Sequence, residues 1–152
     1  MKPKVYLETT IPSLLTARPS RDVVLAGQQL TTREWWNDQR GRYKLYVSVL
    51  VLKEVERGDP MIASERVEKL KECHVLPFPK EAEELTRALL SRRLLPAKAE
   101  TDAAHIATAT VHGMDFLLTW NCRHIANAFI ADRIRAGLRA RRVCRPGIMH
   151  TV

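Results

Sequence analysis

The sequence predicts an α/β fold with three layers (α/β/α), in which helices cover both faces of a mostly parallel central sheet. Short runs of β-forming residues recur along the chain, and the segments between them repeat apolar residues at helical spacing. Such alternation is typical of βαβ units, whose crossover helices make neighbouring strands parallel. The chain has 152 residues, the size of one domain, and shows no linker or internal repeat. We therefore expect a single domain over residues 1–152.

The expected strands are short apolar or alternating runs, over residues 4–7, 43–49, 74–76, 115–119 and 142–144. The expected helices begin with a segment whose first turn contains Pro12, after Thr9 or Thr10 as the cap. Further helices are expected over residues 20–37, 50–57, about 63–70, 80–92, 100–112 and 125–140. Gly113 ends the helix over residues 100–112, as glycine commonly does just past a helix C-terminus.

The chain is strongly basic. Lys and Arg total 25 against 17 for Asp and Glu, which gives a net charge of +8 and a pI of about 9.8. Arginines are dense in the C-terminal segment over residues 133–145. Such a charge balance is typical of nucleic-acid-binding proteins. It fits equally well a protein partner with an acidic surface, or charged side chains that serve only solubility.

Several classes of protein are disfavoured. No apolar run approaches the roughly 18 residues of a membrane span. The first residues lack the apolar core of a signal peptide, so we expect a cytoplasmic protein without a membrane segment. The three cysteines (Cys73, Cys122 and Cys144) are widely spaced, which argues against a disulfide framework or a zinc site. The sequence offers no convincing Ser-His-Asp or Cys-His nucleophile set.

Four polar residues stand where strands end or helices begin: Glu8, Glu54, Asp102 and Asn121. Glu8 and Asn121 follow two expected strands, Glu54 lies about one turn into a helix, and Asp102 lies in a first helical turn. Ligands of parallel sheets bind outside the carboxyl ends of the strands. If the strands are neighbours, these side chains can form one metal site, because carboxylate and amide oxygens suit hard cations.

Each of these residues also has a structural interpretation. Glu8 can serve as a helix-cap partner or in a salt bridge, Glu54 can be an ordinary surface residue, and the helix dipole alone favours Asp102. Asn121 can cap a helix rather than bind metal. Other residues weighed for the site have structural roles that we favour: turns for Asp59 and Asp115, the core for His105, and the core or an interface for the Trp35-Trp36 pair.

Four ordered blocks resemble PIN domains. They are V-Y-L-E-T-T-I-P-S (residues 5–13), V-L-V-L-K-E-V-E-R-G-D (49–59), T-D-A-A-H-I-A-T-A (101–109) and G-M-D-F-L-L-T-W-N (113–121). Their order and spacing are similar to those of the VapC-like toxins of bacterial toxin–antitoxin pairs. The resemblance implies a Mg²⁺-dependent ribonuclease, in which Mn²⁺ can substitute, with a cognate antitoxin protein as partner and a homodimeric assembly.

The resemblance also assigns roles. Glu8, Glu54 and Asp102 match three metal-binding and catalytic acids, although most members have Asp at the position of Glu8. The fourth acid is replaced by Asn121, which keeps a carbonyl oxygen but loses a charge, so we expect one well-held ion rather than two. Thr9 and Thr119 are expected to hydrogen-bond the carboxylates or a substrate phosphate. Arg123 and His124 follow Asn121 directly and are placed to contact the phosphate.

These observations favour a metal-dependent endoribonuclease that hydrolyses RNA phosphodiester bonds, because bound Mg²⁺ neutralises phosphoryl charge and activates water. The departures at Glu8 and Asn121 leave a second hypothesis open, a PIN-like domain with weakened catalysis that binds RNA or a protein. A metal-dependent phosphatase is a third.

Overall fold

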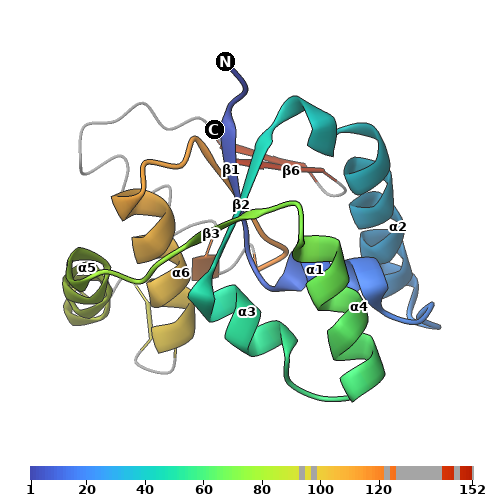
Figure 1. The fold of residues 1–152 in the computed structure, drawn as a ribbon, viewed down its shortest axis with the longest axis horizontal. Coiled ribbons are helices and arrows are strands. Elements are labelled where there is room, and N and C mark those ends of the chain that lie inside the picture. Colours follow the sequence, from blue (N-terminus) through green and yellow to red (C-terminus); the bar gives the residue numbers. More distant parts are fainter. Residues whose placement is uncertain (93–94, 97–98, 122–123, 126–141, 146–147, 152) are drawn as a thin grey trace.

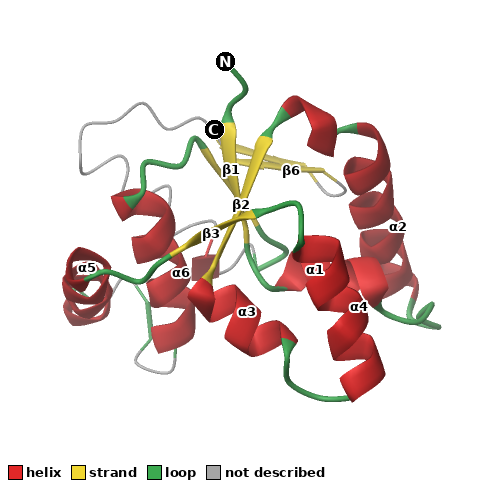
Figure 2. Cartoon of the chain, in the orientation of Figure 1, coloured by secondary structure: helices red, strands yellow, loops and turns green. Residues whose placement is uncertain are grey.

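The computed structural model describes residues 1–92, 95–96, 99–121, 124–125, 142–145 and 148–151. In this part of the chain, helices alternate with short strands (Figure 2). The elements are β1 (Lys4–Leu7), α1 (Thr10–Thr16), α2 (Val23–Asp38), the 3-10 helix η1 (Arg40–Arg42), β2 (Lys44–Ser48), α3 (Val49–Val55), α4 (Pro60–Leu70), β3 (His74–Leu76), α5 (Lys80–Ser91), α6 (Glu100–Val111), β4 (Phe116–Leu118), β5 (Arg142–Arg145) and β6 (Ile148–Thr151).

The central sheet has the strand order β3-β2-β1-β4, and all neighbouring strands are parallel. Val5 in β1 pairs with Leu45 of β2 on one side and with Phe116 of β4 on the other. The chain adds β2 and β3 on one side of β1 and then places β4 on the opposite side. The order therefore reverses between β1 and β4, which is where open α/β sheets bind their ligands.

Helices cover both faces of the sheet (Figure 1). α5 packs against α6 on one face, while α1 packs against α2 and α4 on the other. This arrangement confirms the predicted three-layer α/β/α fold. In the described part of the chain, no helix is long and apolar enough to cross a membrane.

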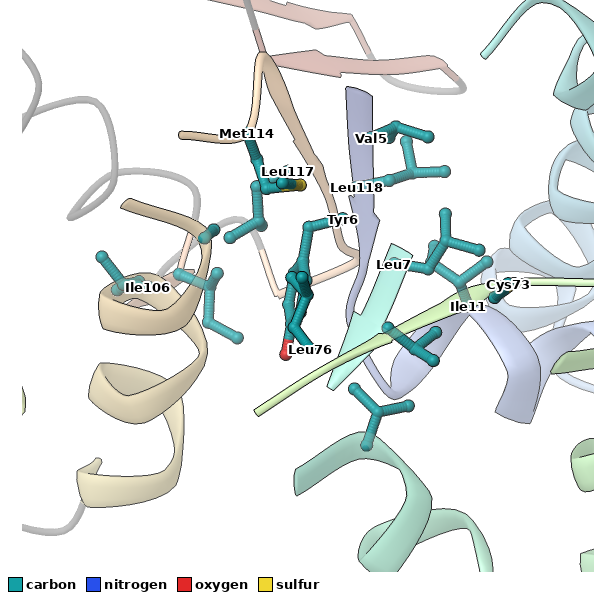
Figure 3. Close-up of a cluster of buried hydrophobic side chains, with 14 of the residues drawn as sticks. Val5, Tyr6, Leu7, Ile11, Cys73, Leu76, Ile106, Met114, Leu117 and Leu118 are labelled. Carbon is teal, nitrogen blue, oxygen red and sulfur yellow. The ribbon is translucent and has the colours of Figure 1, made fainter. Parts of the chain in front are cut away.

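Side chains of β1 alternate between the two helical layers. Val5, Tyr6 and Leu7 are each at most 2% exposed. Figure 3 shows the Tyr6 ring on the side of Ile106 of α6, whereas Val5 and Leu7 point to the opposite side of the sheet, where Ile11 of α1 lies. Because successive side chains of a strand point to opposite faces, this single strand supplies core residues to both layers. Its central position makes the residue that follows it, Glu8, a buried one.

The start of α1 agrees with the expectation, except for the cap's hydrogen bond. Thr9 is the N-cap residue and Pro12 lies in the first turn, as predicted, but the Thr9 side chain makes no capping hydrogen bond. The carboxylate of Glu8 instead accepts the Thr10 backbone N–H at 3.1 Å. The acid before the helix therefore does the work expected of a threonine, since it satisfies a backbone donor that the first turn leaves free.

Other element boundaries shift by a few residues. The second helix begins at Val23 rather than residue 20, because the Asp22 side chain caps it by accepting the Leu25 N–H. β3 spans residues 74–76 as predicted. β6 was not predicted; it pairs antiparallel with β5. The helix expected over residues 125–140 lies, apart from its first residue, outside the described residues.

Several residues with two possible interpretations prove structural. Trp35 and Trp36 are 8% and 4% exposed and belong to the core. Asp59 caps α4, since its Oδ1 accepts the backbone N–H groups of Met61 and Ile62. Asp115 accepts the backbone N–H of Lys4 at 2.8 Å. The structural interpretations of these four residues are confirmed.

We predict that Asp59→Ala lowers the free energy of unfolding by about 1 kcal/mol, the usual cost of removing a helix N-cap. The measurement is urea denaturation followed by circular dichroism at neutral pH. Glu65→Ala on the same helix is the matched control, because Glu65 is exposed and caps nothing. Equal losses in the two variants would contradict the capping role.

Candidate metal centre

Glu8 is a buried carboxylate held by threonines. It is 5% exposed, and its Oε2 accepts hydrogen bonds from Thr10 Oγ1 at 2.6 Å and Thr119 Oγ1 at 2.8 Å, besides the Thr10 backbone N–H. Its backbone N–H donates to the carbonyl of Leu118 at 3.0 Å, which continues the pairing of β1 with β4. Charge-assisted bonds of this kind offset the cost of burying an ionised group. One oxygen of Glu8 is thereby fixed from two elements.

Glu54 approaches Glu8 from α3. The helix follows β2 directly, and its cap Ser48 accepts the Val51 N–H at 3.3 Å. Glu54 Oε1 accepts a hydrogen bond from His105 Nε2 at 2.8 Å. Partial burial raises the pKa of Glu54, but the hydrogen bond and the charge of His105, the hydroxyl of Thr9 and the charge of Arg57 together lower it, so the pKa lies below its usual range. Glu54 is therefore ionised at neutral pH.

Thr9 lies beside these two acids. Its hydroxyl also lowers the pKa of Glu54. Thr9 Oγ1 is buried and forms no hydrogen bond of good geometry with the described residues. A buried hydroxyl normally finds a partner. An unsatisfied oxygen at this place therefore fits a site that a hydrated cation completes.

Three side chains form one group of potential ligands. The ligand atoms of Glu8, Glu54 and His105 all lie within 4.8 Å of one another. Two of the three are carboxylates, which are the ligands that Mg²⁺ and Mn²⁺ prefer. Two negative charges at this separation repel each other strongly unless a cation or a bonded proton lies nearby. The residues present thus fit a divalent metal ion.

Asp102 and Asn121 meet beside this group. Asp102 Oδ2 accepts from Asn121 Nδ2 at 3.1 Å and from the His124 ring Nδ1 at 3.2 Å. Asn121 Oδ1 accepts the His124 backbone N–H at 3.1 Å, and its own N–H donates to Thr119 Oγ1 at 2.9 Å. Thr119 therefore links the Asp102–Asn121 pair to Glu8 through two successive hydrogen bonds.

The structure thus joins the four expected residues as two linked pairs. Glu8 and Glu54 share the three-residue ligand group, whereas Asp102 lies outside that group and pairs with Asn121. Asn121 makes the capping contact that its structural interpretation requires, while its role as a metal ligand stays a prediction. Arg123 lies outside the described residues, as do most of the C-terminal arginines.

The sequence placed His105 in the core rather than in the site. It is indeed 1% exposed, but both ring nitrogens make hydrogen bonds, one of them to Glu54. The available signal was its position, one helical turn after Asp102 on the same helix, because residues three apart share a helix face.

A wide hollow of about 1420 Å³ lies at the amino ends of the strands, lined by residues such as Lys4, Lys44 and Phe116. None of the predicted site residues lines it. The candidate site is therefore the ligand group of Glu8, Glu54 and His105, and not this hollow.

We predict that the pH dependence of stability reports the Glu54–His105 contact. A lowered pKa in the folded state contributes stability above the unfolded pKa, near 4.5, and that contribution is lost as the pH falls through the folded value. Urea denaturation between pH 7 and pH 3 should therefore show Glu54→Gln less stable than the parent at pH 7 and the gap narrowing in acid. A gap that is constant over this range would contradict the assignment.

Comparison with known proteins agrees with this geometry. A family model for the PIN domain matches residues 25–129, most of the chain. The match begins after β1, yet β1 pairs with β2 and β4, which both lie inside it, so Glu8 belongs to the same sheet. PIN domains are generally metal-dependent nucleases. No curated protein matches the chain. On this match and fold, the chain belongs to the PIN domain family.

Proposed function

We propose that this PIN domain is an endoribonuclease of the toxin type, dependent on Mg²⁺ or Mn²⁺. The observation that carries the proposal is the meeting of Glu8, which follows the carboxyl end of β1, with Glu54 of α3, the helix that follows the neighbouring strand β2. The net charge of +8 supports a polyanionic substrate, because such a protein attracts phosphates from a distance.

Glu8 and Glu54 would hold the cation, with Asp102 as a third acid that contacts it directly or through water. A cation bound there would neutralise charge on the scissile phosphate and lower the pKa of an attacking water. The chain's own part is to keep the acids in place before substrate arrives. Thr10 and Thr119 fix Glu8, and Asn121 fixes Asp102.

His124 is the described residue best placed to contact substrate. Its side chain is 37% exposed, and its Nδ1 is directed to Asp102. The other ring nitrogen makes no hydrogen bond to any described residue and is free to approach a phosphate oxygen. We assign Arg123, the preceding residue in the chain, to the same role, because arginine is the usual partner of phosphate.

One cation fits better than two. Asn121 stands where similar proteins have a fourth acid, and its side-chain oxygen already accepts the His124 backbone N–H. A second Mg²⁺ would need further carboxylates, and the described part of the site places two, Glu8 and Glu54, within one ligand group.

Toxins of this type act with partner proteins, and the positive net charge of this chain fits an acidic partner. A cognate antitoxin with an acidic segment would neutralise the basic surface, and the resemblance to VapC-like toxins further implies a homodimer in the cytoplasm. These assignments are part of the proposal.

A second candidate function is binding without cleavage. It is favoured by the placement of Asp102, which lies outside the ligand group formed by Glu8, Glu54 and His105. A domain with this arrangement would bind RNA or a protein through its basic surface. Metal binding and RNA cleavage, measured separately, distinguish the two functions.

We predict that Glu54→Gln and Asp102→Asn each reduce RNA cleavage in Mg²⁺ by at least about 100-fold, since outer-shell partners alone cost 10- to 100-fold. Cleavage of a mixed RNA substrate by purified protein is the measurement. Glu65→Gln, an exposed change far from the acids in sequence, is the control and should cleave like the parent. Parent-like cleavage by both site variants would remove the proposed mechanism.

We further predict one saturable Mn²⁺ site in the RNA-free protein, observed by calorimetry or electron paramagnetic resonance at millimolar metal. Glu54→Gln should weaken this binding because it removes one of the paired charges. Saturable binding without RNA cleavage would support the binding module, whereas absence of any saturable site would contradict both the metal centre and the nuclease.

A further inference from the structure

A row of hydrogen bonds runs from the sheet to Glu54. Ser48 Oγ and Tyr6 OH are 2.8 Å apart, Tyr6 OH and His105 Nδ1 are 2.7 Å apart, and His105 Nε2 lies 2.8 Å from Glu54 Oε1. Ser48, Tyr6 and His105 are each at most 1% exposed. The row connects β2, β1, α6 and α3, so the position of Glu54 depends on four elements at once.

The protons along the row follow from the chemistry at its end. A carboxylate oxygen accepts hydrogen bonds, so the 2.8 Å contact with Glu54 Oε1 places the ring hydrogen on His105 Nε2. Burial keeps the phenol of Tyr6 protonated, because it raises the pKa of Tyr6 far above its usual range. With its ring hydrogen on Nε2, His105 accepts at Nδ1 from the Tyr6 hydroxyl, and Ser48 donates to Tyr6 while it accepts the Val51 N–H. Every donor and acceptor in this row is then satisfied.

Glu54 needs such a support. It lies at the end of a short helix, has a long side chain, and must stay near another carboxylate, that of Glu8. Holding a flexible side chain against like-charge repulsion costs conformational entropy and electrostatic energy. The buried imidazole of His105 offsets both costs. Tyr6 fixes its Nδ1, so its Nε2 donates to Glu54 from a fixed direction, and this hydrogen bond stabilises the carboxylate.

We propose that His105 is a positioning residue, which Tyr6 and Ser48 hold in place so that it orients Glu54 for the metal ion. This inference rests on the proposed metal-dependent function and adds a residue to it. A purely structural core residue would need packing alone, and an apolar side chain would serve as well. The two hydrogen bonds of His105 argue against that reading. A third possibility, that Nε2 itself binds the metal, is an outcome of the test.

Two substitutions of His105 test the hydrogen bonds of its two ring nitrogens one at a time. In His105→Gln, the amide nitrogen can occupy the place of Nε2 and still donate to Glu54. In His105→Asn, the shorter amide can occupy the place of Nδ1, keep the contact with Tyr6, and no longer reach Glu54. Tyr6→Phe keeps the buried ring and removes only the hydroxyl that anchors the imidazole. Thermal unfolding of each variant shows whether the fold is retained.

The primary measurement is Mn²⁺ binding without RNA, so it does not depend on nuclease activity. We expect His105→Asn to weaken binding by about 10- to 100-fold, the range typical of outer-shell partners of a metal site. His105→Gln should bind nearly as the parent does, and Tyr6→Phe should fall between the two. Combined with Glu54→Gln, His105→Asn should weaken binding no further, because the two changes act through one contact.

Each outcome has a meaning. Equal weakening by His105→Asn and His105→Gln, or additive effects of His105→Asn and Glu54→Gln, would overturn the positioning role. In the case of equal weakening, a coupling through a direct bond between Mn²⁺ and ¹⁵N-labelled His105 of the parent, detected by pulsed electron paramagnetic resonance, would show that His105 is a ligand. Rescue by His105→Gln supports the proposal even if the parent cleaves no RNA. If the parent binds Mn²⁺ and cleaves no RNA, the nuclease assignment fails while the positioning role is still tested. If the folded parent binds no Mn²⁺, both fail.

Discussion

The burial of one carboxylate at the end of the central strand is the constraint on which the rest of the site depends. β1 lies between β2 and β4 and supplies core residues to both helical layers, so the chain cannot leave it at Leu7 without placing Glu8 inside. An ionised group there is tolerated only with strong partners. Thr10 and Thr119 supply them from the two segments that leave β1 and β4. The start of α1 and the end of β4 are thereby joined.

The second acid follows from the first. Glu54 can stand beside Glu8 because a hydrogen bond from a buried imidazole accompanies it, and that imidazole is held by Tyr6 of β1. One short strand therefore contributes in two ways: its side chain Tyr6 supports the donor to Glu54, and its following residue is the neighbouring acid. A pair of carboxylates prepared in this way keeps its shape with little reorganisation when a cation binds, which is the condition for a preorganised site.

The sequence allowed the fold and part of the site to be predicted because those features are local. Alternating runs and flanking prolines located β3 to the residue, and Glu8 followed an apolar strand. What failed depends on contacts between distant segments. The buried row through His105 joins Tyr6 of β1 to α6, ninety-nine residues further along the chain. β6 was missed although Pro146-Gly147 is a turn signal before it, because a short strand without a long apolar run resembles a tail.

Asn121 explains why the site divides into two pairs. An aspartate at this position could not donate to Asp102, and it would add a negative charge beside that acid. The amide donates through Nδ2, accepts the His124 N–H through Oδ1, and so fixes Asp102 while adding no charge. Compared with an aspartate, Asn121 therefore lacks a negative charge but holds the carboxylate of Asp102 in place. With one charge fewer among the four positions, the arrangement is consistent with our proposal of a single divalent ion at Glu8 and Glu54.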